Sequence, residues 1–267
     1  MLARQRQDLI IQAVEEHGGV RVSELVADLH VSDMTIRRDI EALADKGLVR
    51  KVHGGATRAD RSAEEPGFTA KSEMNPVQKS EIARTAASLI SAGSSVAVSA
   101  GTTAYAVAIE LRAIKRLTVV TNSPRVADLL NDPTRDDLLV VLTGGVRTPS
   151  DALAGPVANE MLASTHVDTL ILGVHGIDLH AGLTTPNLQE AQTNRALIKS
   201  AKRIVVVADH TKWGIIGLST IATLDKVHTL VTDAELDEDA RREISRQGVN
   251  LIVAPRSEEP LPTPVVS

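Results

Sequence analysis

Seven short apolar-rich runs between residues 95 and 253 constrain the fold of this chain most. They are residues 95–99, 117–121, 138–142, 169–174, 203–208, 228–232 and 249–253. Predicted helical segments precede and separate them, at about residues 77–92, 102–112, 124–130, 187–200 and 235–247. Runs of Val, Ile and Leu without regular in–out alternation are typical of parallel strands that helices cover on both faces. We therefore expect a Rossmann-like α/β domain over residues 75–253.

The first 57 residues show a different pattern. Apolar periodicity predicts helices around residues 9–17, 23–30 and 34–45, and alternation predicts a hairpin that begins at residues 48–53. Ser32 is placed to cap the third helix, and Gly47 is placed to end it. Residues 58–74 are polar and contain Pro66 and Gly67, which predicts a linker. The proline-rich segment 254–267 predicts a disordered tail.

Three helices followed by a two-stranded wing form a winged helix-turn-helix, in which the third helix reads the major groove of DNA. Ile36, Ile40 and Leu43 predict the buried stripe of that helix. The residues left on its outward face are Met34, Thr35, Arg37 and Arg38. Six lysines and arginines stand against three acids from Met34 to Arg58, in a chain whose net charge is −5. This local basic patch predicts DNA binding, although the two adjacent arginines also fit a solvated helix face.

Three glycine- or asparagine-containing junctions follow predicted strands of the second domain. They hold Gly101, Thr102 and Thr103 after the first strand, Asn122 after the second, and Gly144, Gly145 and Arg147 after the third. The carboxyl ends of parallel strands share one edge of a sheet, where open α/β folds bind ligands. Unpaired amides at the start of a helix favour an anion there. Each junction alone also fits an ordinary turn or hairpin.

The third helix and the wing resemble a known family. Thr35-Ile-Arg-Arg-Asp39, followed by Val52-His-Gly-Gly55, resembles the signature of the DeoR family of bacterial transcriptional regulators. The resemblance implies a helix-turn-helix motif at about residues 20–39. It implies DNA contacts by Ser32, Thr35, Arg37 and Arg38, with Lys51 and His53 from the wing. His30 stands where the family usually has glycine in the turn, and a left-handed conformation costs a non-glycine residue about 1 kcal/mol.

The second domain resembles the sensor domain of the same family. The matching motifs include Ser-Ala-Gly-Thr-Thr (99–103), Thr-Gly-Gly-Val-Arg (143–147), Gly-Ile-Asp (176–178) and Asp-His-Thr-Lys-Trp (209–213). The resemblance implies a fold similar to ribose-5-phosphate isomerase and glucosamine-6-phosphate deaminase, with a phosphorylated sugar as ligand. It assigns the phosphate to residues 101–103, counter-charges to Arg147 and Lys212, and sugar hydroxyls to Asp178 and Glu190. Ser99-Ala100 and His175 depart from the family pattern.

We therefore expect a transcriptional repressor of carbohydrate uptake or catabolism genes. It would bind double-stranded operator DNA as a homodimer or homotetramer and respond to a phosphorylated sugar. The alternative is a sugar-phosphate isomerase-like enzyme fused to a DNA-binding domain, with His175, Asp178 and His210 as acid–base groups.

We expect neither a cofactor nor a metal site, since the chain has no cysteine and no His-x-x-x-His spacing. The N-terminal residues do not resemble a signal peptide, and no apolar stretch has the length of a membrane span. A cytoplasmic protein with no membrane partner is therefore expected.

Overall fold

The computed structural model describes residues 2–17, 19–52, 54–58 and 67–256. The chain divides into two compact units, Met1–Pro66 and Gly67–Ser267. The first unit contains α1 (Ala3–His17), β1 (Gly19–Arg21), α2 (Val22–Leu29), α3 (Asp33–Asp45), β2 (Val49–Val52) and β3 (Gly55–Arg58). Its core is the apolar stripe predicted from the sequence, with Ile10, Ile36 and Ile40 almost fully buried. The predicted hairpin is present, and β1 extends it to an antiparallel sheet in the order β1-β3-β2.

The turn between α2 and α3 has the conformation that the sequence predicts. His30 is left-handed, with φ 53° and ψ 43°. Ser32 caps α3, because its Oγ accepts a hydrogen bond from the Thr35 N–H at 3.2 Å. At the other end of α3, Gly47 is left-handed and its N–H donates to the Ala44 carbonyl. Both ends of α3 are therefore fixed by local contacts.

The second unit is built on a seven-stranded sheet in the order β15-β14-β12-β9-β4-β5-β6, and every pairing in it is parallel. The strands are β4 (Ser95–Val98), β5 (Leu117–Thr121), β6 (Leu138–Leu142), β9 (Val167–Gly173), β12 (Ala201–Val207), β14 (Thr229–Thr232) and β15 (Asn250–Val253). They correspond one for one to the seven apolar runs of the sequence. The α/β prediction is therefore confirmed.

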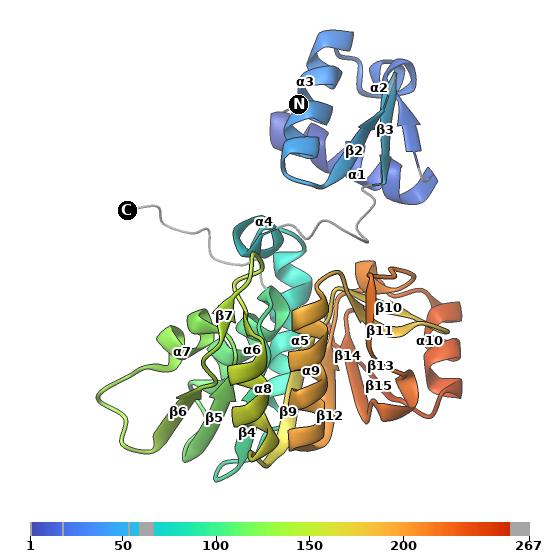
Figure 1. Ribbon diagram of the computed structural model, residues 1–267. Coiled ribbons are helices and arrows are strands. Elements are labelled where there is room, and N and C mark those ends of the chain that lie inside the picture. Colours follow the sequence, from blue (N-terminus) through green and yellow to red (C-terminus); the bar gives the residue numbers. More distant parts are fainter. Residues whose placement is uncertain (1, 18, 53, 59–66, 257–267) are drawn as a thin grey trace. The chain divides into compact units, whose positions relative to one another are not determined.

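Helices cover both faces of this sheet (Figure 1). One face carries α5 (Pro76–Ala87), α6 (Thr102–Leu111) and α7 (Pro124–Leu130). The other carries α8 (Pro156–Ala163), α9 (Leu188–Ser200) and α10 (Glu238–Arg246). Successive residues of a strand point to opposite faces of the sheet. Val96 and Val98 of β4 pack against the helices of the first face, and Ala97 packs against those of the second. Among the described helices, none combines the length and apolar character of a membrane span.

Within the described part of the second unit, two small sheets and two short 3-10 helices lie outside the main sheet, and the sequence did not predict them. One is the hairpin of β7 (Val146–Arg147) and β8 (Leu153–Ala154). The other contains β10 (Gly176–Asp178), β11 (Gly182–Thr185) and β13 (Ser219–Ala222). The 3-10 helices are η1 (His210–Lys212) and η2 (Leu224–Lys226). These elements follow the carboxyl ends of strands and are too short to show periodicity in the sequence.

The structure corrects two predicted boundaries. The expected linker 58–74 contains a helix, α4 (Phe68–Ser72), which belongs to the second unit. Phe68 anchors it, because its ring meets the Tyr105 ring edge-on with 5.5 Å between centroids. The expected tail begins too early, since Ala254 is fully buried and its N–H donates to the Thr232 carbonyl at 2.7 Å. Residues 257–267 lie outside the described residues.

The strand order creates a topological switch point beside β4. From β4 the chain adds β5 and β6 on one side, and then β9, β12, β14 and β15 on the other. Open α/β sheets bind ligands at such a point, outside the carboxyl ends of the strands. The carboxyl end of β4 leads directly into residues 99–103, the first predicted anion site.

Candidate functional sites

The outward face of α3 presents the residues that the sequence assigns to DNA. Met34 is 68% exposed, and Arg37 and Arg38 are also exposed. Ile36 and Ile40, on the opposite face, are buried in the core of the unit. The predicted orientation of α3 is therefore present. Its contacts with DNA stay a prediction.

Two of the predicted DNA-binding cations contact acids of their own unit. Arg37 bonds to Asp33 one turn earlier, with 3.2 Å between Nη2 and Oδ2. Lys51 Nζ lies 2.8 Å from Glu41 Oε1. All four side chains are about half exposed, and ion pairs at such positions are weak because water screens them. A DNA phosphate can therefore displace either acid. His53 lies outside the described residues.

A buried polar contact fixes α3 against α1. Asp39 is 4% exposed and accepts hydrogen bonds from Arg6 Nε and, at 3.2 Å, from Gln7 Nε2. Sequence reasoning counted Asp39 only as an acid of the basic patch. Its partners lie more than thirty positions away, so no local signal in the sequence identifies it.

Gly101 forms the junction between β4 and α6 in the second unit. Its φ of 131° and ψ of 154° belong to a region that is essentially restricted to glycine. Among the described residues, no side chain caps the start of α6. The first amides of a helix have no acceptor within the helix, and the helix dipole makes this end positive. Thr102 and Thr103 therefore begin α6 with N–H groups that suit an anion.

Asn122 connects this junction to its neighbours. Its Oδ1 accepts a hydrogen bond from the Ala100 N–H at 2.8 Å, and its Nδ2 donates to the Leu153 carbonyl at 3.1 Å. The side chain is buried. The structure thus brings Asn122 beside the 101–103 junction as predicted, but its amide is occupied in holding β8 to the end of β4. We assign it a positioning role.

Gly144 and Gly145 precede β7 and do not form a hairpin turn themselves, and Gly145 permits a close approach of the backbone. Both have positive φ, 71° and 119°. A Cβ atom on Gly145 would lie 2.7 Å from the Ala154 carbonyl oxygen. Only glycine therefore lets β7 lie against β8 at this point.

Arg147 and Glu190 both contact the turn between β7 and β8. Arg147 Nε bonds to Asp151 at 2.5 Å, and the Ser150 hydroxyl donates to Glu190 Oε1. The Arg147 guanidinium lowers the pKa of the Asp151 carboxyl, and Arg125 adds to this effect. The hydrogen bond and ion pair described for Arg147 are thus with the turn between β7 and β8. They are not with the segment that carries Lys212.

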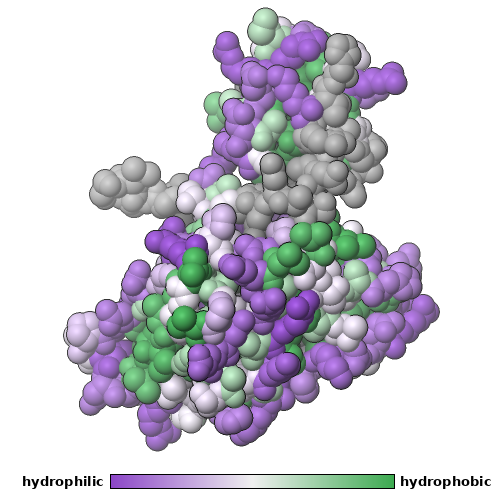
Figure 2. Space-filling model, in the orientation of Figure 1, coloured by the Kyte–Doolittle hydropathy of each residue, from purple (hydrophilic) through white to green (hydrophobic). Residues whose placement is uncertain are grey.

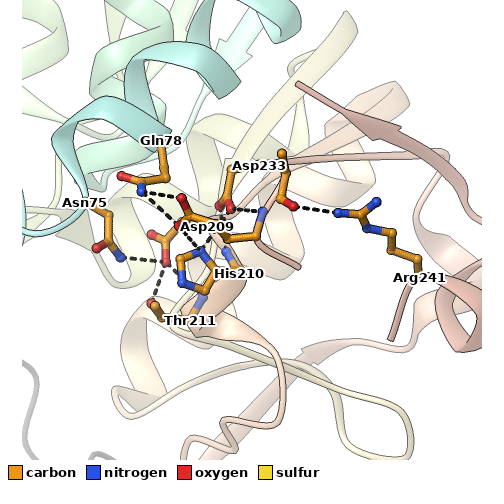
Figure 3. A network of polar contacts seen from close by, with 9 residues as sticks. Asn75, Gln78, Asp209, His210, Thr211, Asp233 and Arg241 are labelled. Carbon is orange, nitrogen blue, oxygen red and sulfur yellow. Dashed lines mark hydrogen bonds and ion pairs between the residues drawn. The ribbon is translucent and has the colours of Figure 1, made fainter. Parts of the chain in front are cut away.

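A second polar cluster surrounds Asp209, at the carboxyl end of β12 (Figure 3). Asp209 is 2% exposed and accepts hydrogen bonds from Asn75 Nδ2, at 3.2 Å, and from Thr211. Burial alone would raise the pKa of the Asp209 carboxyl. Lys212, Thr211 and Lys79 outweigh burial, so the pKa lies below its usual value.

Lys79 lies on α5 and belongs to the same cluster. The residue is 6% exposed, and its ammonium donates to the Met74 carbonyl at 2.6 Å and to the Lys71 carbonyl. Burial lowers the pKa of Lys79 from 10.5 to about 8, although Asp209 opposes the shift. Lys212 adds a second cation close to Asp209. The structure therefore brings together two lysines and one buried carboxylate at this edge.

Three potential metal ligands lie beside this cluster: His210, Asp233 and Glu235, with ligand atoms within 4.8 Å of one another. His210 Nδ1 is 2.9 Å from Asp233 Oδ1, and the His210 N–H donates to Asp233 Oδ2 (Figure 3). Burial lowers the pKa of His210, but the bond to Asp233 outweighs it, and the pKa lies above its usual value. A metal would have to displace that bond. The geometry is therefore that of a charged hydrogen-bonded pair.

Asp178 closes the turn between β10 and β11. Its Oδ1 accepts hydrogen bonds from the N–H groups of His180 and Ala181, both at 2.8 Å. The neighbouring Ile177 pairs with Trp213, and its carbonyl accepts a bond from Gly214 at 2.8 Å. The strand of Asp178 therefore runs beside the segment of Lys212, while its carboxylate has a structural role.

Three residues of these clusters were missed as functional candidates, namely Lys79, Arg125 and Asp151, and Asp209 was named only as part of a motif. Asp209 begins the Asp-His-Thr-Lys-Trp motif, so a signal for it was present. Lys79 is one polar residue among several on its helix. Arg125 and Asp151 are 26 positions apart, and only the fold brings them together.

Comparison with known proteins finds a matching family model for each of the two units. A family model described as the DeoR-like helix-turn-helix domain matches residues 6–62, and one described as the DeoR C terminal sensor domain matches residues 74–234. The HTH-type transcriptional regulator GlpR of Haloferax volcanii is 36% identical over 94% of this chain and 98% of its own length. The glycerol-3-phosphate regulon repressor of Escherichia coli is 33% identical over 88% of this chain and 92% of its own length.

Among solved structures, ribose 5 phosphate isomerase A from Neisseria gonorrhoeae aligns with 52% of this chain and 54% of its own length. The sequence identity is 17% and the TM-score is 0.37.

Proposed function

The chain belongs to the DeoR family of transcriptional regulators, and we propose that it represses genes of carbohydrate uptake or catabolism under the control of a phosphorylated sugar. The observation that carries this proposal is the exposed face of α3, on a compact unit separate from an α/β sensor unit. An α-helix with outward arginines fits the major groove of DNA. Binding of a ligand to the second unit then shifts the population of DNA-competent molecules.

The proposed DNA contacts come from α3 and the wing. Arginine forks bind guanine edges or phosphates, while smaller side chains position the helix. The residues are Ser32, Met34, Thr35, Arg37, Arg38, Lys51 and His53. The Ser32 hydroxyl is already engaged in capping α3, so its contact with DNA would be a second bond to the same oxygen.

The proposed effector site lies at the carboxyl edge of the sheet. The start of α6 at Gly101, Thr102 and Thr103 would bind the phosphate, and Lys212 would supply a counter-charge. Asn122 supports this site through its side-chain amide, and Gly144 and Gly145 support it through the backbone. The name of the Escherichia coli relative, a glycerol-3-phosphate regulon repressor, supports a phosphorylated effector.

We also propose that the protein works as a homodimer or homotetramer in the cytoplasm. Val146 on β7 and Val157 on α8 are 66% and 64% exposed. Apolar side chains gather over these elements in the space-filling view (Figure 2). Exposed apolar surface of this kind favours association between protein chains. A two-fold assembly would present two copies of α3 to a symmetric operator.

An isomerase-like enzyme is the second candidate. Lys79, with a pKa of about 8, and the His210–Asp233 pair are acid–base groups near the proposed site. However, an isomerase has no need of a DNA-reading unit, and the relatives are named as regulators. We therefore propose that these groups bind and position a ligand and that the protein is a regulator without a catalytic step or a cofactor.

Operator binding by variants of α3 tests the proposal. In the full-length chain, we expect Arg37→Ala and Arg38→Ala each to weaken specific operator binding by about 10- to 100-fold, as loss of an arginine contact typically does. Circular dichroism should show an unchanged fold. Arg242→Ala is the matched control, because Arg242 is a half-exposed arginine paired with acids on α10. Unchanged binding by both α3 variants would refute the assignment of α3.

A further inference from the structure

The strand β6 lies at one edge of the main sheet of the second unit, next to β5 (Figure 1). Within the described residues, no strand pairs with its outer side. Its sequence is Leu-Leu-Val-Val-Leu, and Leu139 and Leu142 are 59% and 43% exposed. The strand at the other edge, β15, begins with the polar Asn250 and has no large apolar side chain that is exposed. An uncovered apolar edge strand without charge or proline is a ready template for pairing with another chain.

The hydrogen bonds of β6 determine which of its backbone groups face outward. Thr143, directly after β6, donates its N–H to the Thr121 carbonyl of β5 at 3.0 Å. The backbone groups of successive residues in a strand point to alternate sides. Those of Val141 and Leu139 therefore also point toward β5. The residues whose backbone groups point away from the sheet are Leu138, Val140 and Leu142.

Charge favours one direction of pairing between two copies of this strand. The charged residues Arg135, Asp136 and Asp137 precede β6, and the uncharged residues 143–145 follow it. A parallel second copy would place each charge beside its own counterpart, and like charges directly opposite one another are destabilising. An antiparallel second copy places the charged segment beside the uncharged one. A two-fold axis, the commonest symmetry of homodimers, generates this antiparallel arrangement.

We propose that β6 pairs antiparallel with β6 of a second copy of this chain, about a two-fold axis at Val140. The proposal rests on the association proposed above and specifies its interface. In this register Val140 pairs with Val140 of the second copy, and Leu138 pairs with Leu142 of the second copy. All the outward N–H and C=O groups of the strand then have partners, whereas a shifted register leaves some of them unpaired within the strand.

The side chains on the first face of the strand fit this register. Leu138 and Val140 pack toward the core under α6 and α7, and Leu142 shares their face because side chains alternate along a strand. A cavity of about 330 Å³ lies beside Leu138, at the C-terminal ends of α6 and α7. Its apolar lining consists of Ile109, Ala113, Leu129, Leu130 and Leu138, and two acids and two arginines complete it. Leu142 of the second copy would lie opposite Leu138, at the rim of this cavity.

The other face of the strand extends the interface. Leu139 and Val141 point to the face that carries α8, since Val141 packs with the core of that face. In the proposed register, Leu139 lies opposite Val141 of the second copy. The exposed Val157 of α8 adjoins Gly144, because its Cγ1 is 3.5 Å from the position of a Cβ atom there. A specific interface buries about 1,200–2,000 Å², so the side chains on both faces must add to the area of the strand pair.

Sedimentation equilibrium of the full-length chain tests the proposal. The Val140 N–H points outward, so Val140→Pro keeps the bonds to β5 and removes a bond to the second copy. Leu139→Lys places a charge in the apolar interface. We expect each variant to weaken self-association by about tenfold or more, so that the mass of the assembly falls to half, with an unchanged circular dichroism spectrum. Leu218→Lys is the matched control: Leu218 is 66% exposed and lies outside the main sheet, so the mass should not change.

Engineered cysteines test the register. The chain has no cysteine, so a disulfide forms only where cysteines are introduced. Leu139 and Val141 of the second copy form a pair without hydrogen bonds, whose Cα atoms lie about 4.5 Å apart, within the range of a disulfide. Mild oxidation of a mixture of the Leu139→Cys and Val141→Cys chains should therefore give a covalent dimer. Either variant alone should give much less.

Three results would overturn the proposal. They are a monomer at every concentration, an assembly whose mass neither Val140→Pro nor Leu139→Lys changes, and a mixture of the cysteine variants that cross-links no better than either alone. A monomer would also contradict the proposed homodimer or homotetramer. An unchanged mass in both variants would contradict the β6 interface alone. Operator binding by the α3 variants is a separate readout, so none of these results bears on the assignment of α3.

Discussion

Lys79 is the residue whose charge the fold perturbs most clearly. Its ammonium is buried and bonded to two backbone carbonyls, and its pKa falls to about 8. The folded state therefore releases a proton that the unfolded chain retains up to about pH 10.5. Because the unfolded state binds more protons in this interval, Lys79 makes stability rise with pH between about 8 and 10.5.

The pH dependence of stability tests this placement. Integrating the two pKa values predicts that the wild-type chain gains about 2 kcal/mol relative to Lys79→Met between pH 8 and pH 10. Chemical denaturation at the two pH values, followed by Trp213 emission, measures the difference. If the free energy of unfolding changed with pH equally in the two proteins, the Lys79 ammonium would not be buried.

At the scale of elements, the turn between α2 and α3 depends on a residue in an unfavourable conformation. His30 is left-handed and exposed, so few contacts compensate for the cost of its backbone. Glycine adopts this conformation without the clash of a Cβ atom. The turn still forms because Ser32 caps α3 and the core of the unit is well packed.

Replacing His30 tests the account of this turn. His30→Gly should stabilise the first unit by up to about 1 kcal/mol, which corresponds to about fivefold slower hydrogen exchange of the α3 amides. His30→Ala keeps the unfavourable conformation and should give no such gain. Mass spectrometry of the full-length chain resolves the α3 peptides. Equal exchange in the glycine and alanine variants would contradict a strained turn.

The regular elements could be predicted because each carries its own signal. Each of the seven strands contains a run of apolar residues, which is typical of buried parallel strands, and Ser32 marks the start of α3. The helix α8 was missed because it spans only Pro156–Ala163, and α4 was missed because it lies in a polar stretch. Short elements of this kind are fixed by tertiary contacts, such as that of Phe68 with Tyr105.

The candidate sites were predictable only where a motif is continuous in the sequence. Residues 101–103 follow a strand and begin a helix, so their geometry could be predicted from the order of elements. The pairing of Arg125 with Asp151 could not, because they come from a helix and a hairpin 26 positions apart. The structural role of Asp178 was also missed. The sequence alone does not distinguish an aspartate that closes a turn from an aspartate that binds a ligand.

At the scale of the whole molecule, the chain combines a DNA-reading unit with a sensor unit. Linkage requires that a ligand which changes operator affinity has its own affinity changed by operator DNA to the same extent. The proposed contacts are ionic at both sites, to DNA phosphates on one unit and to a phosphorylated sugar on the other. The coupling between them is therefore the property that distinguishes a regulator from two independent binding modules.

The most direct test is operator binding by the full-length chain in the presence of a panel of phosphorylated sugars, each paired with its unphosphorylated form. The account predicts that at least one phosphorylated sugar changes operator affinity tenfold or more at constant ionic strength, and that its unphosphorylated partner does not. An operator affinity that no phosphorylated sugar alters, or that sugars with and without phosphate alter equally, would contradict it.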